Sequence, residues 1–158
     1  ENVRLNNISN IELCKYGLWN SNKQIIINID PNNIWHNSIV NDFWSWIKKN
    51  IRIKKIDDVI KNIKNINLSK VKIIKIDVEG FEFDVLKWMN NFLVNYNGII
   101  VMEFTPSIYN KQTQDIIDFI YGKWFDVYII NPNWKINKID LNDFKNIEQI
   151  NILLKKSK

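Results

Sequence analysis

The chain has 158 residues, of which 46% are hydrophobic and 25% charged, a balance typical of one soluble globular domain. No stretch reaches the roughly 20 apolar residues of a membrane span, and the first ten residues lack the basic start and apolar run of a signal peptide. The only cysteine, Cys14, excludes an intramolecular disulfide and a metal site built on several thiolates. We therefore expect a single cytoplasmic domain over residues 1–158, with no membrane partner.

The net charge of +5 raises the question of nucleic-acid binding. Arginine, which makes bidentate contacts to phosphate and guanine, occurs only at Arg4 and Arg52. Lysine, asparagine and isoleucine are used throughout the chain, as drift towards A/T-rich codons would produce. Nucleic acid therefore stays open as a partner but is not favoured.

The first part of the chain begins with a β-rich pattern. Apolar runs predict strands over Ile11–Tyr16 and Ile25–Ile29, with a turn between them. A short helix is predicted over Asp42–Lys49. Isoleucine and valine then recur at helical spacing over Ile56–Ile66, after the acidic pair Asp57-Asp58, and predict a second helix.

In the second part, strand patterns alternate with helix patterns. Val71–Ile76 is a β-branched run that ends at Asp77, and Gly80 then opens an amphipathic helix. The apolar face of that helix contains Phe81, Val85, Trp88 or Met89, and Phe92, while Glu82, Asp84, Lys87 and Asn90 face out.

Further strands are predicted over Ile99–Phe104, Trp124–Ile130 and Ile150–Leu154, with a helix over Gln112–Tyr121. The alternation indicates crossover connections. We therefore expect an α/β fold with a mostly parallel sheet.

This arrangement of strands makes two carboxylates candidate catalytic residues. Asp77 and Glu103 lie at the ends of predicted strands, and ligands of open α/β sheets bind beyond the carboxyl ends of strands. One carboxylate could accept a proton while the other orients a substrate or offsets a positive charge. Glu103 also ends a buried apolar run, where an acid needs a partner or a ligand.

A structural interpretation applies to the acids nearest the helix start. Acidic residues in the first turn complement the positive end of the helix dipole. We favour that interpretation for Glu82 and Asp84, whereas for Glu79 the structural and functional interpretations are balanced. His36, the only histidine, has no visible partner, no metal-ligand spacing is present, and Trp88 and Trp124 fall on core-facing positions.

The segment Lys75–Lys87 (KIDVEGFEFDVLK) resembles the signature of FkbM methyltransferases, an Asp-Val-Glu-Gly followed by a helix beginning Glu-x-x-Val-Leu. Four further segments match in the family's order. Ile56–Ile60 resembles the Leu-Asp-Asp-Leu-Leu helix start, Val101–Phe104 the Val-Val-Glu-Phe strand, Trp124–Tyr128 the Gly-Tyr-x-Val-Tyr strand, and Asn151–Leu154 the closing strand. The resemblance covers nearly the whole chain.

The resemblance implies a Rossmann-like class I methyltransferase sheet with strand order 3-2-1-4-5-7-6. It implies transfer of a methyl group from S-adenosylmethionine to a hydroxyl of a sugar or other small polar acceptor, such as a glycan or a natural product. Asp77 would lie near the methyl group and the acceptor, with Glu103 and Glu79 in support, and Gly80 would allow a tight turn. The cofactor would contact Asp77, Gly80 and the turn formed by Tyr16, Gly17, Leu18 and Trp19.

The family binds its cofactor with a Gly-rich loop after the first strand and an acid at the end of the second. Neither lies upstream of Ile11, so we expect the chain to be the C-terminal part of the family domain, with the first two strands absent from it. Either Ile11–Ile29 then docks on the strand ending at Asp77, or another chain or an N-terminal segment completes the sheet. A catalytically silent interaction module and an RNA 2′-O-methyltransferase are the alternative functions.

Overall fold

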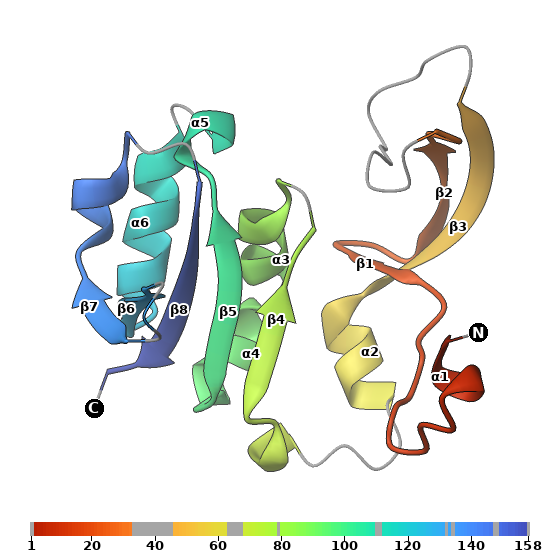
Figure 1. The fold of residues 1–158 in the computed structure, drawn as a ribbon, viewed down its shortest axis with the longest axis horizontal. Coiled ribbons are helices and arrows are strands. Elements are labelled where there is room, and N and C mark those ends of the chain that lie inside the picture. Colours follow the sequence, from red (N-terminus) through yellow and green to blue (C-terminus); the bar gives the residue numbers. More distant parts are fainter. Residues whose placement is uncertain are drawn as a thin grey trace. The chain divides into compact units, whose positions relative to one another are not determined.

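The structure is a computed structural model, and it describes residues 2–32, 46–62, 68–78, 80–109, 112–131, 133, 135–146 and 149–157 (Figure 1). By its internal contacts the chain divides into two compact units, Glu1–Lys55 and Ile56–Lys158. Each unit contains a sheet of its own.

The first unit contains a short helix, α1 (Asn2–Leu5), and a sheet in the order β1-β3-β2. The strands are β1 (Gly17–Trp19), β2 (Lys23–Ile29) and β3 (Ile47–Lys55). β2 and β3 pair antiparallel, and β1 joins β3 in parallel. Ile25 lies opposite Ile51 and Ile29 opposite Ile47, so β-branched side chains pair across the two long strands.

The strand predicted over Ile25–Ile29 is confirmed, but two other predictions for this unit are wrong. Residues 11–15 have no regular structure, and the strand begins only at Gly17. Residues 47–49 start β3 and are not helical, while 42–45 lie outside the described residues. In both segments, pairing with strands distant in the sequence determines which residues are extended. A Cβ on Gly17 would lie 3.2 Å from Cγ2 of Ile53, so a residue without a side chain lets β1 approach β3 closely.

The second unit is built on a five-stranded sheet in the order β4-β5-β8-β6-β7. Its strands are β4 (Ile73–Ile76), β5 (Ile99–Phe104), β6 (Phe125–Ile130), β7 (Ile136–Ile139) and β8 (Ile150–Lys156). β4 and β5 pair in parallel, and the other three pairings are antiparallel. The prediction of a mostly parallel sheet is therefore wrong, because β8 lies between β5 and β6 and runs antiparallel to both. The order β4-β5-β8-β6 agrees with the 4-5-7-6 part of the expected strand order.

The helices of the second unit share one apolar core with its sheet. They are α2 (Ile56–Asn62), α3 (Glu82–Trp88), α4 (Asn90–Asn95), α5 (Pro106–Tyr109) and α6 (Thr113–Gly122), with short 3₁₀ turns η1 (Leu68–Lys70) and η3 (Leu141–Phe144). In Figure 1, α3, α4 and α6 all lie behind the sheet. Their apolar residues form one core with the inward side chains of the strands, among them Leu86, Leu93, Ile100, Phe104, Ile116 and Ile120. None of the helices in the described parts of the chain is long and apolar enough to cross a membrane.

The order of the strands also decides what pairs with β4. Among the described strands β4 pairs with β5 alone, while β1 and β2 pair with β3. The described strand pairings therefore do not include the first of the two expected outcomes, in which Ile11–Ile29 docks on the strand that ends at Asp77.

Candidate active site

Asp77 and Glu103 lie at the carboxyl edge of the parallel pair β4 and β5. The register places Ile76 beside Met102, so the next residues along, Asp77 and Glu103, come to the same edge of the sheet. Ile76 and Met102 point into the core, and because side chains alternate along a strand, Glu103 faces away from the helices. The sequence-based expectation that both carboxylates end neighbouring strands holds in the structure.

Among the described residues, each of the two carboxylates has a polar partner. Lys75 forms an ion pair with Asp77, and both side chains are more than half exposed, at 63% and 51%. Exposed pairs of this kind contribute only about 0–1 kcal/mol, so a ligand can displace the ammonium group readily. The Gln149 side-chain amide donates a hydrogen bond to Glu103, which is partly buried. The predicted need of Glu103 for a partner is therefore met by Gln149. Glu79 lies outside the described residues.

The connection between β4 and α3 depends on one glycine and one buried acid. Gly80 has a φ of 97°, a backbone conformation that a residue with a side chain adopts only under strain. Glu82, two residues later, is 0% exposed. Its Oε1 accepts a hydrogen bond from the Val78 amide at 3.0 Å, and its two oxygens share the Gly80 amide at 3.1 and 3.2 Å.

Tyr109 of α5 completes this arrangement. Its hydroxyl donates to Oε2 of Glu82 at 2.7 Å. Burial raises the pKa of the Tyr109 hydroxyl, and the hydrogen bond to Glu82 raises that pKa further, so the group stays a donor. The prediction that Glu82 faces out is wrong. The signal in the sequence was an acid two residues after a glycine at a strand-to-helix turn, a spacing that suits capping of free amides.

The residues predicted to approach adenine belong to the first unit. Gly17, Leu18 and Trp19 form β1, and Tyr16 precedes it. The Lys54 ammonium group lies 4.5 Å from the centre of the Tyr16 ring, a cation–π contact. Asp77, Gly80 and Glu103 belong to the second unit.

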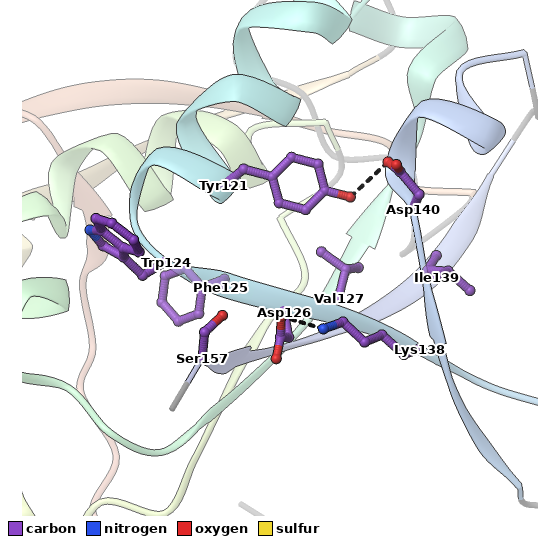
Figure 2. Close-up of a pocket in the computed structure, with 9 residues that line it drawn as sticks. All are labelled: Tyr121, Trp124, Phe125, Asp126, Val127, Lys138, Ile139, Asp140 and Ser157. Carbon is purple, nitrogen blue, oxygen red and sulfur yellow. Dashed lines mark hydrogen bonds and ion pairs between the residues drawn. The ribbon is translucent and has the colours of Figure 1, made fainter.

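A pocket of about 470 Å³ lies elsewhere on the second unit (Figure 2). It is lined by Tyr121, Trp124, Phe125, Asp126, Val127, Lys138, Ile139, Asp140 and Ser157. β5 and β6 are both antiparallel to β8, so they run in the same direction, and the start of β6 lies at the opposite end of the sheet from Glu103. None of the predicted site residues lines this pocket.

Charged and hydroxyl groups of the pocket bind one another. Lys138 pairs with Asp126 at 2.7 Å, and this hydrogen bond lowers the pKa of the Asp126 carboxyl. The Tyr121 hydroxyl donates to Asp140 at 3.0 Å (Figure 2). The same hydroxyl accepts a hydrogen bond from the Leu141 amide at 2.8 Å. These pairs join α6, β6 and the end of β7, so they hold the elements around the pocket in place.

Trp124, at the edge of the pocket, is 74% exposed and has a φ of 63°. The prediction that it packs in the core is therefore wrong. It follows α6 in the left-handed conformation that commonly ends helices and favours glycine, and glycine stands there in the family pattern that this strand resembles.

We expect Trp124→Gly to be more stable than Trp124→Ala by about 1 kcal/mol, because only glycine adopts this φ without a steric penalty. Both variants remove the indole, so their difference isolates the backbone term. Urea denaturation of the two proteins measures it. Equal stabilities would show that the positive φ is not strained.

Comparison with protein-family models gives a match that includes residues of both units. The model described as the methyltransferase FkbM domain matches residues 3–149. A search of curated proteins and a search of solved structures each found no similar protein. The match includes both carboxylates at the edge of β4 and β5, the Gly80 turn and the buried Glu82. The chain therefore belongs to the FkbM methyltransferase family.

Proposed function

We propose that this chain acts as an S-adenosylmethionine-dependent O-methyltransferase on a hydroxyl of a sugar or another small polar acceptor. The observation that supports this most is the placement of Asp77 and Glu103 at one edge of a parallel strand pair, in a chain of a methyltransferase family. Two carboxylates there provide a proton acceptor and an orienting group for an acceptor hydroxyl.

The charge of this edge suits the cofactor that the family implies. When bound, S-adenosylmethionine supplies an electrophilic methyl group on a cationic sulfonium. The Asp77 carboxylate is half exposed and the Glu103 carboxylate partly so, and negative groups of this kind favour a cation nearby. Gly80 allows the backbone to turn tightly beside the ligand. We propose that the adenine of the cofactor contacts Tyr16, Gly17, Leu18 and Trp19.

The two carboxylates have different roles in the proposed reaction. Asp77 would accept the proton that the acceptor hydroxyl releases as its oxygen bonds to the methyl carbon, while the carbon–sulfur bond breaks and the sulfur leaves as a neutral thioether. Glu103, held by Gln149, would orient the acceptor through a second hydrogen bond. Glu79 is proposed to support Asp77.

Calorimetric titration of the chain with S-adenosylmethionine tests the first part of this proposal. Incubation with the cofactor and a panel of simple sugars, followed by mass spectrometry, tests the second. Saturable binding and methylated sugars are expected. A chain that folds but binds no cofactor would instead favour an interaction module, and methylation confined to RNA would change the substrate class.

Glu103→Gln is expected to lower the rate of methyl transfer by about tenfold, because the neutral amide can still hydrogen-bond an acceptor but weakens its orientation. The effect should be smaller than that of the same change at Asp77. Rates at saturating cofactor measure it. A larger loss at Glu103 than at Asp77 would reverse the two assigned roles.

A further inference from the structure

We infer that Glu82 and Tyr109 are positioning residues that hold Asp77 in its working orientation, an inference that rests on the proposed function. Neither side chain lies at the open edge of the sheet. Both act on the backbone next to Asp77. The Glu82 carboxylate accepts hydrogen bonds from that backbone and from the Tyr109 hydroxyl.

Both backbone contacts of Glu82 lie in the turn that follows Asp77. Val78 follows Asp77 directly, and its amide donates to Glu82 at 3.0 Å. The Gly80 amide donates to the same carboxylate at 3.1 and 3.2 Å. The connection from β4 to α3 is therefore held at two points, which limits rotation of the backbone next to Asp77.

Tyr109 extends this hold to the neighbouring strand. It ends α5 (Pro106–Tyr109), which begins two residues after β5. Its bond to Glu82 at 2.7 Å therefore ties the segment after β4 to the segment after β5, the two strands whose ends carry Asp77 and Glu103. Ile108, also in α5, lies close to the turn, because a Cβ added to Gly80 would come within 3.6 Å of its Cγ2.

Interaction with the helix dipole does not by itself explain a buried carboxylate here. An acid that complements a helix dipole works from the surface, whereas burying a charge has an unfavourable desolvation energy that only strong hydrogen bonds offset. An apolar side chain could fill the same volume, but it could not accept these three donors. Charge-assisted hydrogen bonds are shorter and stronger than neutral ones, so they suit a connection that must not move. Misplacement of a reacting group by about 1 Å can lower a rate a hundredfold.

Tyr109→Phe is the primary test, because it removes one hydroxyl and leaves the packing in place. We expect the Val78 and Gly80 amides to exchange with deuterium about tenfold faster, and methyl transfer at saturating cofactor to fall about tenfold or more. The Met102 amide in β5 should keep its exchange rate, which separates a local loosening from a loss of global stability. Amide exchange is followed by NMR, without cofactor.

Tyr121→Phe is the matched control. It also removes a hydroxyl that donates to a carboxylate, but at the opposite end of the sheet. It should change neither exchange at Val78 and Gly80 nor methyl transfer. Glu82→Gln provides a second variant, with the same shape and no charge, and it should loosen the same two amides.

The outcomes separate this inference from the proposed function. Unchanged amide exchange at Val78 and Gly80 in both Tyr109→Phe and Glu82→Gln would show that these hydrogen bonds do not restrain the turn after β4. Faster exchange with a normal transfer rate would overturn the positioning role. If the wild-type chain transfers no methyl group but the variants show the expected faster exchange, the proposed function is refuted. The restraint of the turn by Glu82 and Tyr109 would still be established.

Discussion

Asp77→Asn is expected to lower the rate of methyl transfer by a factor of about 10³ while leaving the fold intact. A positioned general base contributes about 10²- to 10⁴-fold to a rate, and asparagine keeps the shape of the side chain but cannot accept a proton. The ion pair with Lys75 is exposed, so its loss should change the free energy of unfolding by less than about 1 kcal/mol.

Asp84→Asn is the matched control for this experiment. Asp84 lies in the same signature segment and pairs with Lys87 at 2.9 Å, with both side chains about 40% exposed. Removing its charge should leave the transfer rate unchanged. Isotope-labelled S-adenosylmethionine measures both rates, and urea denaturation measures both stabilities. A transfer rate that stays normal in Asp77→Asn would end the catalytic assignment of this residue.

Glu82→Leu is expected to destabilise the second unit by about 3 kcal/mol or more. The change leaves three part-buried donors, the Val78 amide, the Gly80 amide and the Tyr109 hydroxyl, without their acceptor, and a donor left unsatisfied away from water costs about 1–3 kcal/mol. Leucine is similar in volume to glutamate, so loss of packing contributes little.

Two further variants distinguish a lost acceptor from a general effect of the substitution. Glu82→Gln keeps one carbonyl oxygen for the amides, so it should cost less than the leucine variant. Asp84→Leu places the same apolar side chain at an exposed position of α3 and should stay within about 0.5 kcal/mol of the wild type. Urea denaturation gives all three values. A Glu82→Leu protein as stable as the wild type would mean that water replaces the carboxylate as the acceptor.

The two candidate carboxylates, Asp77 and Glu103, could be predicted from the sequence because the pattern that predicts them is local. A β-branched run that ends in an acid and is followed by Gly80 predicts a strand, a turn and a helix from neighbouring residues alone. The same holds for Ile99–Phe104, which forms β5 as predicted. Their meeting at one edge then follows from the parallel pairing of two strands joined by a helix.

Other features depend on residues that are far apart in the chain. The direction of β8 between β5 and β6, and the strand conformation of Ile47–Lys55, are decided by pairing partners that a local pattern does not contain. Trp124 is exposed because the backbone leaves α6 in a left-handed conformation. Glu82 has the sequence context of a surface acid at a helix start, and only the arrival of Tyr109, 27 residues later, encloses it.

The sequence by itself thus determined the family, the strand ends and the acids at them, since these depend on short-range pattern and composition. The tertiary structure alone decided the strand directions and the burial of Glu82. A side chain becomes buried when distant segments pack over it, and the free energy of that packing is shared among contacts that no single segment encodes.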